Sequence, residues 1–424
     1  SPHFGIQKWG DERGAGEGSD LSMNILQLDL ADKKQVRDFL GLPFRIYRDT
    51  PQWVPPLRMD ERARLDLKRY PFYRHSQAAF FLAERFSSPR GRPPIGGRWA
   101  RACLERSRRG EGEIVGRLAV LDNRRYNEFN HEKTAFFYLF ECENDLDAAR
   151  ALFESAFDWA RARDLNRMLG PKGFTALDGF GLLVKGFEHR PAFGLPYNPP
   201  YYSVLIEAAG FKPLNDSVSG YMGANIQFPA RIHELAARIQ GRRGLTIARF
   251  RTRRDLRALV PRLKDLYNAA LGGTSGGTPI TDEEAQAMAS QLLWFADPKL
   301  IKIVMKDDRP VGFLFAYPDV SAALQRTKGR LFPFGWLALL LELRRTEWIN
   351  INGAGMVEEY RGLGGTAILY SEMFKSVTEN PRYRHAEVVQ IGVENDKMQR
   401  EMQNFGIDFY KMHRTYVKDL LLLA

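Results

Sequence analysis

Residues 357–373 combine residue types that could bind a phosphate group. The segment contains three glycines that can adopt positive φ and let a ligand approach the backbone: Gly362, Gly364 and Gly365. An amphipathic helix starting near Thr366 leaves its first N–H groups without helical partners, at the positive end of the helix dipole. Arg361 adds a cation beside them. The pattern therefore predicts a phosphate-binding turn between a strand and a helix.

Two other phosphate loops do not fit this segment. A P-loop needs Lys followed by Ser or Thr after its last glycine, whereas Thr366 and Ala367 follow here. A dinucleotide fingerprint could begin at Gly353, but Glu358 stands where its third glycine belongs. Both classes are excluded at this position.

The elements around the loop follow a regular order between residues 245 and 420. A strand at 245–251 and a helix at 255–271 precede a second helix, which the capping-box pair Thr281 and Glu284 starts and which ends near 295. Period-2 patterns predict paired strands at 300–306 and 310–317. The remaining expected elements are a helical insertion at 337–343, a strand at 347–356, the loop and its helix to about 378, a strand at 386–393, a helix at 396–405 and a final strand at 410–420.

This order resembles that of the GNAT N-acetyltransferases, and Arg361-x-x-Gly364 is similar to their coenzyme-A loop, although Thr366 replaces its last Gly or Ala. The end of the chain, with Asn395, Phe405-Gly406-Ile407 and Tyr416, also resembles the family. The resemblance implies an acetyl-CoA or other acyl-CoA site in this half and no metal. The residues it implies for that site are Met356, Val357, Arg361, Gly362, Leu363, Gly364, Gly365, Thr366 and Asn395.

The terminal pattern occurs a second time, in Asn198, Gly210-Phe211 and Tyr221. Strands expected at 80–85, 112–122 and 134–142 and a helix at 145–162 precede it. We therefore predict an α+β fold of two tandem GNAT-like domains, each a mixed, mostly antiparallel sheet flanked by helices, similar to bacterial tandem-GNAT proteins of unassigned substrate. The predicted divisions are a leader at 1–22, a first domain at 23–225, a linker at 226–244 and a second domain at 245–424.

The two predicted domains differ where the glycine loop would lie. In the first, residues 141–147 contain no glycine and four carboxylates, which repel phosphate. The first domain is therefore expected to lack a coenzyme-A site.

The resemblance implies direct attack of an amine on a thioester, which requires a proton acceptor. Glu347 is the candidate base, with Asn350 and Asn352 able to order a water, although a glutamate at the start of a strand is more often a surface charge. Met402 stands where many members of the family have the tyrosine that protonates the leaving thiolate. Tyr410, Tyr416 or Tyr370 could take that role, although each is more simply a sheet or core aromatic. The aromatic segment 193–202 either lines a substrate cleft between the domains or packs their junction.

The composition bounds the class of protein. With 424 residues, 44% hydrophobic and 12% aromatic, the chain can form two or three globular domains. The two cysteines, Cys103 and Cys142, form neither a disulfide framework nor a zinc site by themselves, so we expect a cytoplasmic protein. No run of 18 apolar residues is present, so we expect no membrane span.

The net charge of +11 is concentrated in one segment. Residues 87–125 contain ten arginines against four acids, around a predicted Pro/Gly/Arg-rich insertion at 86–111. This insertion could bind nucleic acid, an anionic lipid surface or an acidic carrier, or it could be a solvated loop.

The resemblance thus implies an acyl-CoA-dependent N-acyltransferase that acts on a small-molecule or peptide amine. Two alternatives stay open: a catalytically degenerate acyl-CoA-binding protein, and a Fem-like aminoacyl transferase that uses aminoacyl-tRNA. A nucleic-acid partner is not favoured. The sequence predicts neither the acceptor nor the oligomeric state.

Overall fold

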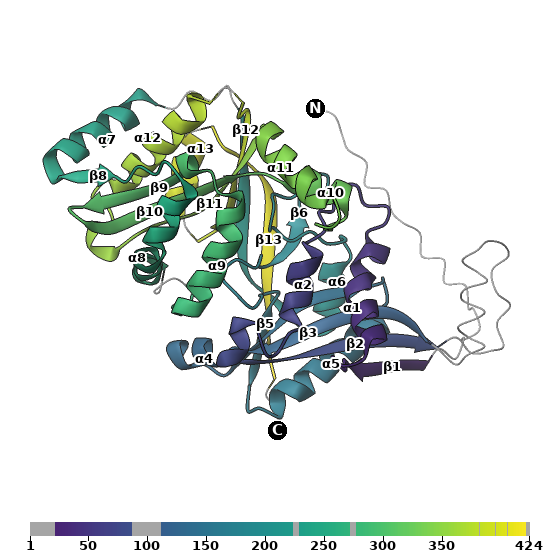
Figure 1. Cartoon of the computed structure of the whole chain (residues 1–424). Helices are drawn as coiled ribbons and strands as arrows, with labels where there is room; N and C mark the ends of the chain where they lie inside the picture. Colours follow the sequence, from purple (N-terminus) through teal and green to yellow (C-terminus); the bar gives the residue numbers. More distant parts are fainter. Residues whose placement is uncertain are drawn as a thin grey trace, which may run out of the picture.

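The computed structural model describes residues 22–86, 112–223, 229–271, 277–380, 382–394, 396–404 and 406–420. Most of the predicted leader and basic insertion, together with Asn395, lie outside the described residues. The described strands form one sheet of 13 strands, with helices on both faces (Figure 1). The predicted α+β class with a mixed, mostly antiparallel sheet is confirmed.

The first half of the chain supplies seven strands of this sheet. The elements predicted at 112–122, 134–142 and 145–162 are confirmed within one or two residues. The bounds are β1 (Ser22–Gln27), α1 (Lys33–Ile46), α2 (Arg58–Arg64), β2 (Gln77–Phe86), β3 (Glu113–Asp122), α4 (Arg124–Asn130), β4 (Thr134–Cys142), α5 (Leu146–Arg161), β5 (Arg167–Gly170), β6 (Leu182–Lys185), α6 (Tyr202–Ala208) and β7 (Lys212–Gly223).

The second half follows the predicted order, with two additional helices. Helix α7 lies within the segment expected to be a linker and packs against α12, and α10 precedes the predicted helical insertion. The bounds are α7 (Ala230–Arg243), β8 (Leu245–Ile247), α8 (Arg253–Leu271), α9 (Asp282–Phe295), β9 (Ile301–Lys306), β10 (Arg309–Pro318), α10 (Ser321–Thr327), α11 (Gly335–Arg345), β11 (Trp348–Met356), α12 (Gly365–Thr378), β12 (His385–Gly392), α13 (Asp396–Asn404) and β13 (Asp408–Asp419).

The two halves exchange their last strands. The sheet order is β1-β2-β3-β4-β5-β13-β7-β12-β11-β10-β9-β8, with β6 beside β13. Strand β7, which ends the first half, pairs with β12 of the second, and β13, which ends the second half, pairs with β5 of the first. Strand β13 therefore runs through the middle of the molecule (Figure 1), so the sheet of each half is completed by the other.

Local sequence signals explain several of these elements. Helix α5 buries Leu152, Phe153, Ala156 and Phe157, whose spacing places them on one helix face against the sheet. Helix α9 begins at the predicted capping box, in which the Thr281 hydroxyl accepts from the Glu284 N–H at 3.0 Å and the Glu284 carboxylate accepts from the Thr281 N–H at 2.8 Å.

The same Glu284 carboxylate also joins the two halves. It accepts hydrogen bonds from Arg125 Nη1 at 3.0 Å and contacts His75 Nε2 at 3.1 Å, both from the first half. A residue that caps a helix locally therefore also fixes the relative position of the halves.

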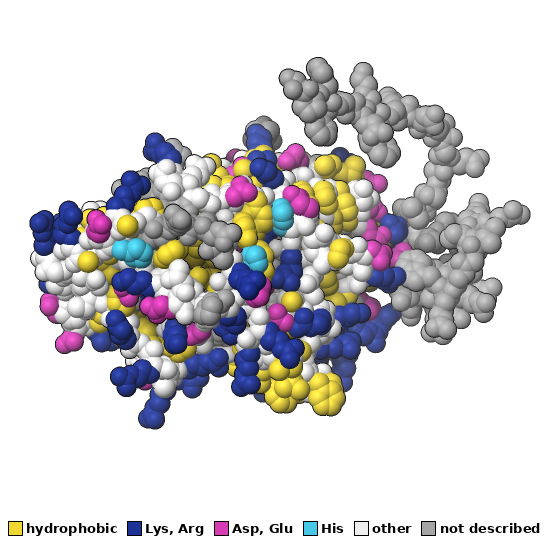
Figure 2. Space-filling view, turned by 90° about the horizontal axis from the view of Figure 1, so that it is seen from above, with side chains coloured by type: hydrophobic (Ala, Val, Ile, Leu, Met, Phe, Trp, Pro, Cys, Tyr) yellow, Lys and Arg dark blue, Asp and Glu magenta, His cyan; other side chains and the backbone are white. Residues whose placement is uncertain are grey.

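Charge is distributed over the surface seen in Figure 2. Lys and Arg side chains lie among acidic and hydrophobic ones on this face, and they do not gather in a single channel. Among the helices that the described residues form, none is long and apolar enough to cross a membrane.

Candidate functional site

The strand before the glycine loop diverges from one of its neighbours. Strand β11 pairs with β12 only through Trp348–Ile351, opposite His385–Val388. Its pairing with β10 is irregular between Leu314 and Ala316, close to Gly353, which has a φ of +91°. Beyond Ile351 the two parallel strands separate, leaving the backbone of residues 352–356 without a β12 partner.

The glycine loop joins β11 to α12 with two residues in the left-handed region. Gly362 has φ +71° and Gly364 has φ +89°. A Cβ on Gly364 would lie 2.0 Å from Cδ1 of Ile239 in α7, whereas nothing lies within 4 Å of a Cβ on Gly362. Helix α12 begins at Gly365, so the N–H groups of Gly365 and Thr366 have no helical carbonyl to bind. The loop therefore presents backbone donors at a helix N-terminus.

The Arg361 side chain fastens this loop to its surroundings. Its guanidinium donates to the Met356 carbonyl at 3.2 Å and to the Ala270 carbonyl, near the end of α8, at 2.8 Å. Met356 and Val357 are buried in the core of the second half, and Leu363 is half-buried. The buried side chains of Met356 and Val357 do not reach a ligand, and the Val357 N–H already donates to the Val311 carbonyl at 3.0 Å.

The three predicted catalytic residues lie apart from one another. Glu347 precedes β11 at the end away from the loop, is half-exposed and lies 3.8 Å from Arg384. Asn352 lies on the diverging part of β11 and donates to the Tyr317 hydroxyl at 3.0 Å. Tyr410 lies on β13, where burial raises its pKa far above the usual range beside the Glu387 carboxylate. Of the three, only Asn352 lines the cavity described next.

A cavity of about 630 Å³ lies between the two halves, and its lining is largely apolar and aromatic. The first half contributes residues of α1, α2, β4 and the segment 177–198, and the second half contributes residues of α9, β10, α11 and β11. Among its lining residues are Tyr47, Leu139, Phe140, Phe193, Leu195, Tyr197, Leu292, Phe295, Tyr317 and Asn352. The aromatic segment 193–202 thus lines a cavity at the junction of the halves.

One carboxylate in this cavity has an unusual environment. Burial raises the pKa of Glu141, at the end of β4, to about 7, although the Arg117 guanidinium opposes the shift from 3.9 Å. The Tyr47 and Tyr202 hydroxyls donate to its Oε2 at 2.8 and 2.7 Å. The Tyr202 hydroxyl also accepts from the Cys142 N–H at 2.9 Å, which orients it. Burial thus brings the pKa of Glu141 close to neutral pH inside a largely apolar cavity.

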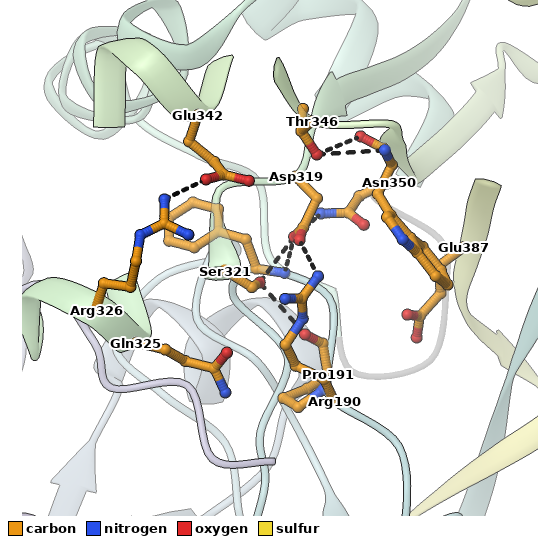
Figure 3. Close-up of polar contacts among 12 residues, drawn as sticks. Arg190, Pro191, Asp319, Ser321, Gln325, Arg326, Glu342, Thr346, Asn350 and Glu387 are labelled. Carbon is orange, nitrogen blue, oxygen red and sulfur yellow. Dashed lines mark hydrogen bonds and ion pairs between the residues drawn. The ribbon is translucent and has the colours of Figure 1, made fainter. Parts of the chain in front are cut away.

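A buried polar network fixes one wall of the cavity. Asp319 Oδ1 accepts from the Phe193 N–H at 3.1 Å, from the Ser321 hydroxyl at 2.7 Å and from Asn350 Nδ2 at 3.0 Å. Its Oδ2 accepts from Arg190 Nη2 at 3.2 Å (Figure 3). Because Arg190 and Phe193 belong to the first half and the others to the second, this carboxylate holds the halves together beside the cavity.

Two known proteins are similar to this chain over most of its length. No family model matches the chain. Protein YghO of Escherichia coli is 24% identical over 406 residues, which cover 94% of this chain and 97% of that protein. A bacterial ceramide synthase of Caulobacter vibrioides is 26% identical over 395 residues, which cover 91% of this chain and 95% of that protein.

Solved structures decide the fold. A tandem GNAT protein from the clavulanic acid biosynthesis pathway superposes with a TM-score of 0.51 and 11% identity, covering 95% of this chain and 100% of that one. The chain has the tandem GNAT fold. A fungal GCN5-related glucosamine N-acetyltransferase region gives a TM-score of 0.52 at 11% identity, covering 94% of this chain and 38% of that one.

In the tandem GNAT fold of this protein, the two halves repeat the same diverging strand pair. Strand β4 pairs with β5 only through Thr134–Phe136, as β11 does with β12 through its first four residues. Leu139 in β4 has φ +52° and Gly353 in β11 has φ +91°, each five residues after the first paired residue. One diverging pair leads to the glycine loop and the other to Glu141.

Sequence reasoning missed Glu141 as a functional residue. It appeared only as the first carboxylate of a segment unsuited to phosphate, because its burial and its two tyrosine donors come from distant parts of the chain. The clue available in the sequence was the tyrosine-rich segment that contains Tyr202, since buried tyrosine hydroxyls need acceptors.

Proposed function

We propose that this protein transfers an acyl group from acyl-CoA to the amine of an apolar, long-chain acceptor and so forms an amide. The observation that carries the proposal is the interdomain cavity, whose lining includes both Glu141 and Asn352. It brings a carboxylate with a pKa of about 7 and the diverging part of β11 to one apolar space.

The donor would be held by the backbone of the second half. The N–H groups at the start of α12 and the open space beside Gly362 suit a pyrophosphate, because backbone donors at a helix N-terminus favour anions. From there, the backbone of residues 352–356, which pairs with β10 on one side and has no β12 partner on the other, can pair with the pantetheine arm on its open side. Asn352 lies four residues before Met356, about 13 Å along an extended strand, so the thioester would reach the cavity.

Glu141 would then accept a proton from the protonated amine of the acceptor. An ammonium has no lone pair, so one proton passes to the Glu141 carboxylate before the nitrogen attacks the thioester carbon. The carbon–sulfur bond breaks, and the thiolate becomes a thiol by taking the second proton that the nitrogen loses. A base with a pKa near the working pH suits this step and contributes roughly 10²–10⁴-fold in rate.

The cavity lining and one relative favour a lipid-like acceptor. Aromatic and aliphatic side chains dominate the cavity and can bury an alkyl chain. A ceramide is the amide of a long-chain amino alcohol, so the relative named as a ceramide synthase supports an acceptor of this chemical class.

The test is amide formation by the full chain from an acyl-CoA and a long-chain amino alcohol, followed by mass spectrometry and by release of free thiol. A short amine of the same head group is the matched control and should react poorly. Saturable acyl-CoA binding without thiol release would favour the degenerate alternative, and absence of acyl-CoA binding by the folded protein would refute the proposal.

Two variants distinguish the candidate bases. Glu141→Gln should lower kcat/KM by roughly 10²–10⁴-fold, whereas Glu347→Gln, at the far end of β11, should retain the wild-type value. The opposite result would assign the base to Glu347.

A further inference from the structure

Helix α11 and the residues before it carry large apolar side chains in contact with solvent. The two most exposed are Phe332 at 79% and Phe334 at 74%. Within α11, Trp336, Leu337, Leu340 and Leu341 are also exposed, and their spacing of one and four residues places them on one side of the helix. We call these six residues the α11 face. Leu339 is fully buried, so the helix is anchored by its opposite side.

Cationic residues border the α11 face. Arg326, Lys328 and Arg330 precede it, and Arg344 and Arg345 follow it, all of them exposed. In residues 321–346 these five bases stand against one acid, Glu342, which gives an excess of four positive charges. An apolar surface inside a cationic border is complementary to an anionic lipid bilayer, which offers hydrocarbon beneath negatively charged head groups.

The α11 face is continuous with the interdomain cavity. Phe332 and Trp336 line the cavity while they are themselves exposed, and so do Met59 of α2 and Trp294 of α9. The cavity therefore reaches the surface between these four side chains. Aromatic side chains at such an opening suit the boundary between water and hydrocarbon, where Trp and other aromatic rings gather.

We propose that the α11 face docks the protein on the surface of an anionic lipid bilayer, with the mouth of the cavity facing the lipid. Helix α11 has 11 residues and is too short to span a bilayer, so it lies in the plane of the interface. Docking itself is independent of the reaction. Passage of a membrane-borne amine from the bilayer into the cavity rests on the proposed function.

Co-sedimentation with phosphatidylcholine vesicles, with and without phosphatidylglycerol, tests the docking without any acyl donor. The full chain should bind the vesicles that contain phosphatidylglycerol, and added salt should weaken this binding. The double variant Phe332→Ser/Phe334→Ser should bind at least tenfold more weakly, because each side chain loses its burial in lipid. Val204→Ser on α6, a 59% exposed apolar control, should bind like wild type.

A charge variant tests whether the cationic border contributes to vesicle binding. Lys328→Glu/Arg330→Glu should lose binding to phosphatidylglycerol vesicles, whereas Arg254→Glu/Arg257→Glu, an exposed pair on α8, should retain it. The inference is overturned if wild type binds neither vesicle, or if the phenylalanine variant binds as well as the controls. It is also overturned if the α11-face variants change only self-association in analytical ultracentrifugation, which would make this face an interface between two copies.

The vesicle and reaction experiments fail independently. Glu141→Gln should bind vesicles like wild type, so loss of acyl transfer with intact docking refutes only the proposed function.

Discussion

The environment of Glu141 predicts how the stability of the protein depends on pH. Its pKa rises from 4.5 to about 7 in the folded protein because the carboxyl is buried. The folded protein therefore holds a proton that the unfolded chain has released between these pH values. Stability from this group is fully present below pH 4.5 and is lost as the pH rises through 7.

The size of the effect follows from the shift. One pKa unit corresponds to about 1.36 kcal/mol, so this group should lower the free energy of unfolding by about 2 to 3 kcal/mol between pH 5 and pH 8. Glu141→Gln keeps a side chain of the same shape near the Tyr47 and Tyr202 hydroxyls and cannot ionise. In this variant that component of the pH dependence should disappear.

Urea unfolding of wild type and Glu141→Gln at pH 5, 6, 7 and 8 measures the difference directly. Glu347→Gln, which removes a half-exposed carboxylate and leaves Glu141 in place, serves as the control and should keep the component assigned to Glu141. Parallel pH profiles for wild type and Glu141→Gln would refute the assignment of a raised pKa to this carboxyl. The same pKa should appear in the reaction as a kcat/KM that rises with pH until about pH 7 and then levels.

Three variants and one chemical treatment test other parts of the structure. Gly362→Ala should cost about 1 kcal/mol of unfolding free energy because of its positive φ. Gly364→Ala should cost about 1–3 kcal/mol more than that, because its Cβ would also overlap Ile239 in α7. Equal costs of the two variants in urea unfolding would contradict this packing. The Lys411 ammonium lies 2.9 Å from the buried Glu387 carboxylate. Lys411→Met leaves that carboxylate without its partner and should cost roughly 3–5 kcal/mol of unfolding free energy in the same assay. A cost below about 1 kcal/mol would show that the pair contributes little to stability. Burial raises the pKa of the Cys142 thiol above its usual range, so iodoacetamide should label this residue only after unfolding. Peptide mass spectrometry measures the labelling. Rapid labelling of the native protein would contradict the burial of Cys142.

Local patterns in the sequence were sufficient to predict most elements. The capping box at Thr281, the period of α5 and the glycine-rich turn from β11 into α12 depend on residues a few positions apart, and such interactions form wherever the segment folds. The mixed α+β class and its repetition along the chain followed from their order.

The tertiary structure alone decided which distant residues meet. The strand exchange pairs β7 with β12 and β13 with β5, and so joins residues roughly 160 to 250 positions apart in the sequence. The local patterns would be the same if each half kept its own last strand. Glu347 and the glycine loop lie at opposite ends of β11, so the length of this strand separates them. Asn352 lines the cavity because its side of β11 faces the cavity, which only the tertiary structure determines.

By itself, the sequence determined a doubled α+β chain with one glycine-rich helix start, because hydrophobic period, capping and turn chemistry are local properties. The unusual chemistry of Glu141 and the exposure of the α11 face depended on the tertiary structure. A pKa is set by burial and by charges that approach through space, and exposure is set by what the rest of the chain leaves uncovered.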